Sequence, residues 1–145
     1  MLKLLPVLAV TIWISGCSTF ESDWERGLAE PKDAAASLRG AWEGTWRSDA
    51  NGHHGGLRAI VTEAAEGSIA RYHATYGCCF TFEYSVPLRV EVRHGTAIFR
   101  GEADLGWLAG GLYRYEGTVE GDRFSSTYRS EADHGVFTMR RVIGH

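Results

Sequence analysis

From Gly40 to the C-terminus, apolar and polar side chains alternate along short stretches that are separated by turn residues. In residues 40–48, Trp42, Gly44 and Trp46 fall on one face, while mostly charged and polar side chains fall on the other. An alternation with a period of two is typical of a strand that buries one of its faces. Since the same pattern recurs to the end of the chain, it limits the fold to the all-β class.

The alternation predicts eight or nine strands. They cover residues 40–48, 57–63, 68–76, 80–86, 88–93, 96–103, 112–119, 123–129 and 136–143. The count depends on Pro87, whose nitrogen has no hydrogen to donate to a neighbouring strand. We expect this proline to mark an edge, a bulge or a bend, and in the nine-strand count it ends a strand.

Glycine-containing turns follow one another at intervals of about 8–12 residues, which is typical of a sandwich or a barrel. Examples are residues 51–52, 94–95 and 120–122. Because the connections are short, strands that are neighbours in sequence should pair as an antiparallel meander. A meander of about eight strands removes its free edges by closing on itself. We therefore expect a small up-and-down barrel domain over residues 31–145, in preference to a sandwich.

The N-terminus has a different pattern. Residues 1–3 carry one positive charge, and residues 4–14 form an apolar run that is broken only by Pro6 and Thr11. This run is too short to cross a membrane, because a spanning helix needs about 20 apolar residues. A basic start, an apolar centre and small residues before a cleavage site are the features of an export signal. We therefore expect residues 1–16 to be a signal peptide that is removed.

The signal ends in Ile14-Ser15-Gly16-Cys17, which resembles the lipobox of bacterial lipoproteins, an aliphatic and two small residues before an invariant cysteine. The resemblance implies that the Cys17 thiol receives a diacylglyceryl group and that the new amino terminus is acylated, for example with palmitate. Stable anchoring needs at least two acyl chains. In this family Ser18, rather than aspartate, after the cysteine implies the outer membrane, facing the periplasm. An ordinary secretory signal with an incidental cysteine is the alternative.

Residues 17–30 are mostly polar and of mixed charge, and we interpret them as a lipidated tether between the membrane and the barrel. Phe20 and Trp24 are isolated apolar residues within it. After the tether, Pro31 to Leu38 are predicted to form a short helix, because proline suits the first helical position and alanine has a high helix propensity. A helix of about two turns is unstable alone, so we expect it to pack on the barrel.

Charge limits the class of partner. The chain carries a formal net charge of −3 at pH 7, and no segment concentrates its basic residues. We therefore do not expect a nucleic acid as a partner. The expected partners are the membrane, through the lipid on Cys17, and either a small apolar ligand or another envelope protein.

Gly40-Ala41-Trp42 begins the first predicted strand, and Arg140-Arg141 lies in the last. These segments resemble the Gly-x-Trp signature of the calycin superfamily, which includes lipocalins and avidins, and the arginine that packs across its tryptophan. The resemblance implies that a cation–π pair ties the first strand to the last at the closed end of the barrel. We favour Arg141 over Arg140, because Arg141 shares the parity of the apolar residues in its strand. The other lipocalin motifs are not evident, and Trp42 alone is also compatible with an ordinary strand core.

Four tyrosines are candidates for binding a ligand inside the barrel, Tyr72, Tyr76, Tyr113 and Tyr115, and Tyr128 could line the same pocket. Tyr72 and Tyr76 share one face of their strand, as do Tyr113 and Tyr115 in theirs. A tyrosine offers an apolar ring together with a hydroxyl that can bind a polar group of a ligand. The alternative is that these residues are plain barrel core.

Cys78-Cys79 and His53-His54 are weak candidates for a redox or metal site. Neighbouring α-carbons lie about 3.8 Å apart, so a disulfide between adjacent cysteines would be strained. The two thiols could also stay unpaired, pair between molecules or bind a metal. Histidines in a turn bind borderline metals, especially near a thiol. However, two adjacent histidines do not make a closed site, and the Cys-x-x-Cys spacing is lacking, so we expect no metal.

The sequence contains no Gly-x-Ser-x-Gly, Walker or zinc-protease pattern. We therefore expect a non-enzymatic envelope lipoprotein without a cofactor, whose barrel binds a small apolar or amphipathic ligand. The first alternative is an interaction or assembly module with a solid core and an exposed apolar patch, for which residues 105–108 are the candidate. The second is a redox or metal protein that uses the cysteine and histidine pairs. An interior cavity of about 300 Å³ or more would favour the ligand-binding protein.

Overall fold

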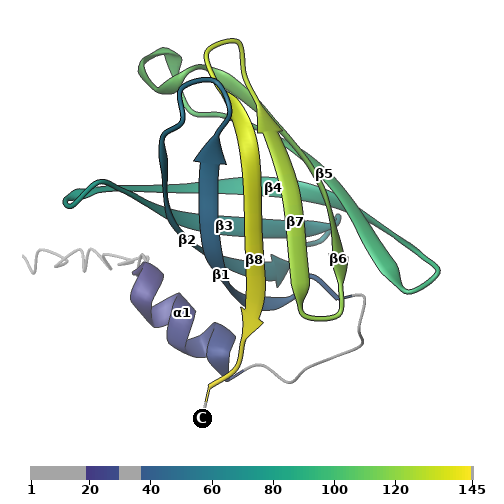
Figure 1. The fold of residues 1–145 in the computed structure, drawn as a ribbon. Coiled ribbons are helices and arrows are strands. Elements are labelled where there is room, and N and C mark those ends of the chain that lie inside the picture. The colour runs from purple at the N-terminus through teal and green to yellow at the C-terminus, as the bar shows by residue number, and fades with distance from the viewer. Residues whose placement is uncertain (1–18, 30–36, 145) are drawn as a thin grey trace, which may run out of the picture.

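The computed structural model describes residues 19–29 and 37–144. The strands form a closed antiparallel barrel, in which each strand pairs with the next and the last strand pairs with the first (Figure 1). This architecture confirms the predicted all-β, up-and-down barrel in preference to a sandwich. Closure satisfies the hydrogen-bonding groups at both edges of the sheet, which an open sheet would leave exposed.

Most of the eight strands begin and end within a few residues of the bounds that the alternation predicts. They are β1 (Gly40–Ser48), β2 (His54–Glu63), β3 (Ser68–Tyr76), β4 (Phe80–Arg93), β5 (Thr96–Asp104), β6 (Leu112–Glu120), β7 (Arg123–Arg129) and β8 (His134–Val142). The helix α1 (Phe20–Leu28) precedes the barrel, and the short 3-10 helix η1 (Trp107–Ala109) lies between β5 and β6. Among the described residues, no helix has the length and apolar character needed to cross a membrane.

β4 runs without interruption through Pro87, so that the strand count is eight rather than nine. The proline lies where this strand changes partners. Pro87 is opposite Ile69 of β3, whereas the pairing with β5 begins at Leu88, opposite Gly101. A residue without an amide hydrogen is tolerated here, because the ladder with β5 has not yet begun. Pro87 thus marks a change of partner within one long strand and does not end a strand.

α1 lies in the stretch that we interpreted as a tether, and the structure corrects that interpretation. Thr19 caps the N-terminus of the helix by accepting a hydrogen bond from the amide of Ser22. Phe20, Trp24 and Gly27 lie on the same side of the helix and are buried. A spacing of three or four residues places side chains on one helix face, and this is the signal that the sequence analysis missed.

The helix that we predicted over Pro31–Leu38 falls mostly outside the described residues, which resume at Ser37. Ser37 and Leu38 themselves are not helical. The Leu38 side chain is 3% exposed and belongs to the hydrophobic core of the barrel. The described part of the segment before β1 therefore packs on the barrel without forming a helix, and the rest of the predicted helix lies outside the described residues.

α1 packs on the outside of the barrel, against β1 and β2 (Figure 1). Phe20 and Trp24 contact Ala41 and Ile60 in a small hydrophobic cluster that is separate from the barrel core. The guanidinium of Arg58 lies over both aromatic rings, 5.1 Å and 5.0 Å from their centroids. Arg58 also forms an ion pair with Glu21, but partly exposed ion pairs contribute little to stability. The burial of the two rings is therefore the main source of the free energy of docking.

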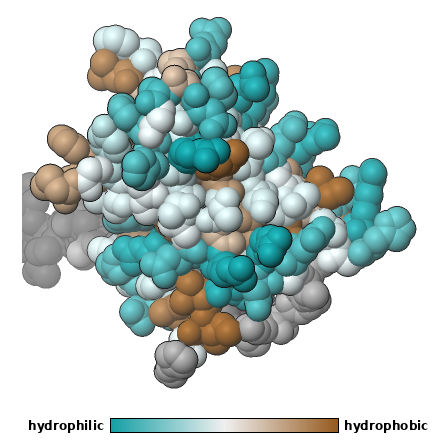
Figure 2. Space-filling model, in the orientation of Figure 1, coloured by the Kyte–Doolittle hydropathy of each residue, from teal (hydrophilic) through white to brown (hydrophobic). Residues whose placement is uncertain are grey.

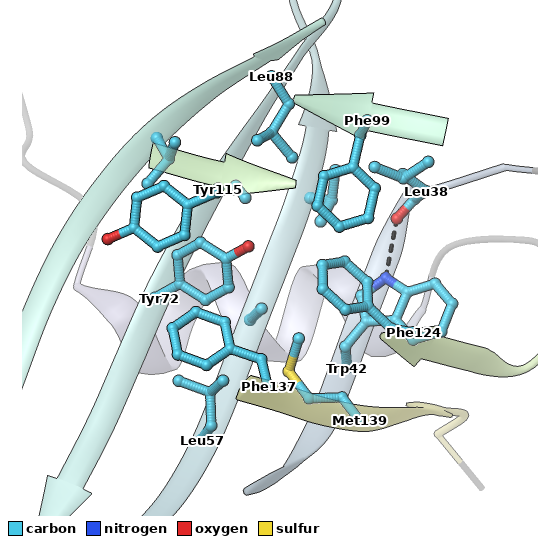
Figure 3. Close-up of a cluster of buried hydrophobic side chains, with 14 of the residues drawn as sticks. Leu38, Trp42, Leu57, Tyr72, Leu88, Phe99, Tyr115, Phe124, Phe137 and Met139 are labelled. Carbon is cyan, nitrogen blue, oxygen red and sulfur yellow. Dashed lines mark hydrogen bonds between the residues drawn. The ribbon is translucent and has the colours of Figure 1, made fainter. Parts of the chain in front are cut away.

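The barrel interior is filled by the inward-facing side chains of all eight strands (Figure 3). The largest of the fully buried side chains are Trp42, Tyr72, Tyr115, Phe99, Phe124 and Leu57. Gly117 of β6 makes room for one of these rings, since a β-carbon there would lie 2.5 Å from Cζ of Phe99. The core therefore combines large rings on some strands with small residues on the strands beside them.

Phe20→Ala should lower the free energy of unfolding by about 3 kcal/mol, because truncating a buried phenylalanine costs about 3–5 kcal/mol and this ring lies at the periphery. The measurement is urea denaturation of the chain without residues 1–17. Glu25→Ala, at an exposed position of the same helix, is the matched control and should change the free energy by less than about 0.5 kcal/mol. Equal stability of Phe20→Ala and the parent chain would show that α1 behaves as a tether after all.

Candidate functional site

One end of the barrel is closed by Trp42 of β1 and Arg141 of β8, which are opposite each other in the register of the two strands. The Arg141 guanidinium lies over the indole, 4.2 Å from the ring centroid. The Trp42 side chain is fully buried, and it also packs on Phe124 of β7 with 5.4 Å between the ring centroids. The two residues that the calycin resemblance singled out are thus in contact, and Arg141 rather than Arg140 provides the cation.

The segment before β1 lies across this closed end and is held by both residues. Arg141 donates hydrogen bonds of 2.6 Å to the carbonyl oxygens of Arg39 and Ser37, from Nη1 and Nη2 respectively. Nε1 of Trp42 donates to the Leu38 carbonyl oxygen at 2.8 Å (Figure 3). These three bonds hold consecutive carbonyl groups of the segment against the barrel.

Arg141 remains a cation in this position. Burial lowers the pKa of its guanidinium, and the carboxylate of Asp122, 3.6 Å away, counteracts that effect. An arginine has a pKa far above physiological pH and presents its donors in a rigid planar fork, so one side chain can bind an indole face and two carbonyl groups together. The closed end is therefore a structural element, and we assign no ligand to it.

Three of the four candidate tyrosines come together inside the barrel. Tyr72 of β3 and Tyr115 of β6 stack with their centroids 6.1 Å apart, and Tyr113 stacks on Tyr115 at 6.3 Å. All three side chains are buried. Tyr76, the fourth, lies at the end of β3, where it is half-buried and its ring is 6.1 Å from that of Trp46. Tyr76 has the parity of Tyr72, as predicted, and it contacts Trp46 at the edge of the core, but its place at the end of β3 keeps it apart from the other three tyrosines.

Two further tyrosines belong to the same cluster. Tyr84 of β4 lies 5.3 Å from Tyr72 and 6.3 Å from Tyr115, and Tyr128 of β7 lies 6.1 Å from Tyr113, all between ring centroids. Tyr84 has the parity of the buried residues that follow it in β4, so its inward direction was readable from the alternation. The contact of Tyr84 with Tyr115 could not be predicted from the alternation, because β4 and β6 are not neighbouring strands.

The hydroxyl groups of this cluster differ in their surroundings and in their partners. Burial raises the pKa of Tyr72, Tyr84 and Tyr115 above that of a free phenol. The Tyr128 hydroxyl donates to Oδ2 of Asp133 at 3.3 Å. The Tyr72 hydroxyl, in contrast, is buried and has no hydrogen-bond partner among the described residues. Such a group costs about 1–3 kcal/mol, so this is a place in the interior where a polar partner would be favourable.

Two clefts mark the described surface, and neither is a pocket inside the barrel. The first has a volume of about 410 Å³ and lies between α1 and the outer faces of β2 and β3, where Asp23, Gly27 and Arg71 line it. The second, of about 800 Å³, runs over β4, β5 and β6, and its lining combines charged side chains with apolar residues and Tyr115. These clefts do not provide the tyrosine-lined interior cavity that would favour a ligand-binding barrel.

The structure does not bring the cysteine and histidine candidates into one site. Cys78 and Cys79 are exposed, free thiols in the turn between β3 and β4, and the hydrogen bond with Cys78 raises the pKa of the Cys79 thiol. The ring of His53 lies against that of Tyr76, tilted, with 4.8 Å between ring centroids, and His54 is exposed at the start of β2. Among the described residues, no group of three or more metal-binding side chains is arranged to hold an ion. A thiol with a raised pKa is also a poor nucleophile, so this geometry does not favour a redox or metal protein.

Besides Ile69, Val92 and Ile143, the large apolar side chains that are exposed in the described part of the chain lie on two connections at the end of the barrel opposite the closed end. They are Phe80 and Phe82 of the β3–β4 hairpin, 63% and 55% exposed, and Trp107, Leu108 and Leu112 beside the β5–β6 connection, 86%, 83% and 46% exposed. Successive connections alternate between the two ends of an up-and-down barrel, so these two lie at the same end. Figure 2 shows apolar groups over both, at the left and upper left of the view. We call these five residues the apolar rim.

The apolar rim contains part of the patch that we expected from the sequence. Trp107 and Leu108 belong to that patch and are exposed, whereas Leu105 packs against the barrel core. The sequence analysis did not single out Phe80 and Phe82, because the alternation places them on the inward face of β4. They are exposed because the β3–β4 hairpin extends past the part of β4 that pairs with β5.

Arg141→Ala should lower the free energy of unfolding by about 3 kcal/mol, because it removes the cation–π pair and leaves two carbonyl groups without their donor. The measurement is urea denaturation followed by tryptophan fluorescence. Arg140→Ala, at the adjacent exposed position, is the matched control and should have an effect below about 0.5 kcal/mol. Equal losses in the two variants would contradict the assignment of the closure to Arg141.

Comparisons with known proteins do not assign this chain to a family. No family model, no curated protein and no solved structure gives a significant match to it. The function therefore has to be inferred from the sequence motifs and from the geometry of the described residues.

Proposed function

We propose that this protein is a lipid-anchored component of the bacterial cell envelope that acts by contact through the apolar rim, without catalysis. The anchor is the acylated Cys17 that the lipobox implies, and Ser18 after it favours the outer membrane, facing the periplasm. An exposed apolar patch on a folded domain marks a site of interaction, which supports a contact function for the rim. This is the interaction module that the sequence analysis held as an alternative to ligand binding.

The observation that carries this proposal is the exposure of Trp107 and Leu108 on an ordered loop, next to a barrel whose interior is filled. Leaving a large apolar side chain exposed forgoes about 1.5–3 kcal/mol of burial free energy. The loop is held by its own backbone hydrogen bonds, from Leu105 to Gly111 at 3.0 Å and from Gly111 to Gly106 at 2.9 Å. The two side chains are therefore presented to solvent on a defined backbone.

The calycin-like character of the barrel is part of this proposal. The contact between Trp42 and Arg141 supports it, because it joins the first strand to the last in the way that the resemblance implies. Residues 37–39 cover the closed end, so a partner of the barrel has access to the opposite end, where the apolar rim lies.

Photo-crosslinking in intact cells tests the contact function. Benzoylphenylalanine in place of Trp107 should give one discrete adduct on illumination, with a protein, a lipid or a second copy of the chain. The same residue in place of Val92, which is 58% exposed at the opposite end of the barrel, is the matched control and should give none. Adducts are detected by a mass shift of the purified protein.

Two results would reject parts of the proposal separately. The absence of an adduct at position 107, or equal adducts at positions 107 and 92, would reject a contact function of the apolar rim. Cys17→Ser should remove the protein from the membrane fraction of the cell, because no acyl chain can then be attached. A variant that stays in that fraction would reject the lipid anchor.

The Tyr72 hydroxyl favours a second candidate function, the binding of a small amphipathic ligand. This hydroxyl is buried among aromatic rings and has no partner in the described part of the chain. A ligand with one polar group and an apolar body would satisfy the hydroxyl and displace or separate the surrounding rings. The proposal is secondary, because the interior rings already pack on one another.

Tyr72→Phe distinguishes the two functions. With no ligand at the hydroxyl, the variant should be as stable as the parent chain or more stable by about 1 kcal/mol, since an unpaired polar group is removed. The measurement is urea denaturation, with Tyr76→Phe at the half-buried tyrosine as control. With a ligand, native mass spectrometry of the protein from its own envelope should show a bound molecule in the parent and none in Tyr72→Phe. A parent chain without a bound molecule would contradict ligand binding.

A further inference from the structure

The tip of the β3–β4 hairpin carries apolar side chains and no charge. Residues 75–82 include no acidic or basic side chain, and Phe80 and Phe82 are more than half exposed within this stretch. The next residue, Glu83, accepts a hydrogen bond of 3.2 Å from Nη2 of Arg71. The tip can therefore enter an apolar medium without carrying an ionised side chain with it, and desolvating a charge is the largest cost of such a transfer.

The opposite end of β4 has the reverse character. Val92 is exposed there to nearly the same extent as Phe82, 58% against 55%. It lies between Glu91 and Arg93, which form an ion pair of 2.8 Å in solvent. This end of the strand is suited to water, and it provides a matched reference for the hairpin tip.

The N-terminal end of α1 is attached to the same hairpin. The rings of Phe20 and His73 lie 4.9 Å apart, and Arg71 of β3 forms an ion pair with Asp23. The start of the helix is therefore held against the outer face of β3, close to the part of the strand that leads to the tip. In Figure 1 the N-terminal end of α1 and the tip of the hairpin lie on the same side of the molecule.

The chain length between the lipid and the helix is short. Only Ser18 separates Cys17 from Thr19, the residue that caps α1, and two extended residues span at most about 7 Å. Along β3, the three residues from His73 to Tyr76, the partner of Phe80, span about 10 Å. The acyl chains and the hairpin tip are thus within reach of one membrane surface, and the helix leaves no long tether through which the barrel could turn away.

We propose that Phe80 and Phe82 enter the leaflet that holds the acyl chains of Cys17, so that the lipid and the hairpin contact the same bilayer. This inference rests on the proposed function, because it needs the lipid anchor, and it names the bilayer as the partner of this part of the apolar rim. Aromatic side chains favour the membrane interface, and a second contact strengthens a lipid anchor. We favour the bilayer over a second copy of the chain as the partner, because the lipid anchor would hold the hairpin next to the bilayer.

Cys78 offers a native position for a probe, since it is exposed two residues before Phe80. The proposed anchor leaves no free thiol at Cys17, because the acyl chain would occupy it. The lipidated Cys79→Ser variant is labelled at Cys78 with a nitroxide and placed in vesicles of phosphatidylethanolamine and phosphatidylglycerol. Electron paramagnetic resonance then measures collisions of the label with oxygen, which concentrates in the bilayer, and with a nickel chelate, which stays in water. Gly95→Cys in a Cys78→Ser, Cys79→Ser background places the reference label in the β4–β5 turn.

The Cys78 label should collide several-fold more often with oxygen and several-fold less often with nickel than the label at position 95. Phe80→Asp combined with Phe82→Asp should restore nickel access while the protein still floats with the vesicles, whereas Val92→Asp should leave the protection unchanged. Both phenylalanines are exposed, so the double substitution is compatible with the fold.

Three results would overturn the inference, and they have different meanings. Equal nickel access at positions 78 and 95, in protein that floats with the vesicles, would exclude insertion and leave the lipid anchor intact. Protection of the Cys78 label from both oxygen and nickel would place the tip against protein, such as a second copy of the chain. Protein that does not float with the vesicles would overturn the anchor and, with it, the insertion.

Discussion

The pairing of β1 with β8 is the constraint on which the rest of the structure depends. Without it the sheet would have two long free edges, and the aromatic rings of the core would face solvent. Trp42 and Arg141 secure this pairing at one end, where one cation binds an indole face and two carbonyl groups of the segment before β1. That segment covers the closed end, and the apolar rim at the other end is left accessible.

The interior of the barrel is used for stability. A barrel of about eight strands has an interior just wide enough for its own side chains or for one small ligand, and here aromatic rings occupy it. Stacked tyrosines fill the half of the barrel away from Trp42, and Tyr72 is the member whose hydroxyl has no partner among the described residues. Because aromatic rings occupy the interior, the surface of the barrel is the more accessible place for a contact with another molecule.

α1 packs on the strands that close the barrel, and its docking bears on how the barrel would be oriented on a membrane. The helix covers the outer faces of β1 and β2 with Phe20 and Trp24, and its start is attached to β3 through an ion pair and an aromatic contact. A flexible tether would leave the orientation of the barrel on a membrane undefined. A docked helix that begins at Phe20 instead relates Cys17, the site of the proposed lipid anchor, to the face of the molecule that carries the uncharged β3–β4 tip.

The sequence by itself determined the strands, the turns, the barrel and the inward direction of Trp42, Arg141 and the tyrosines, because alternation and turn chemistry are local properties of the chain. Only the tertiary structure decided that Phe20 and Trp24 dock as a helix and that Phe80 and Phe82 are exposed despite facing inward. It also decided that Tyr76 lies apart from the other tyrosines, and that the histidines and cysteines form no common site. The physical reason is that burial depends on which distant segments cover a side chain, and the change of partner along β4 and the docking of α1 are set by contacts between residues far apart in sequence.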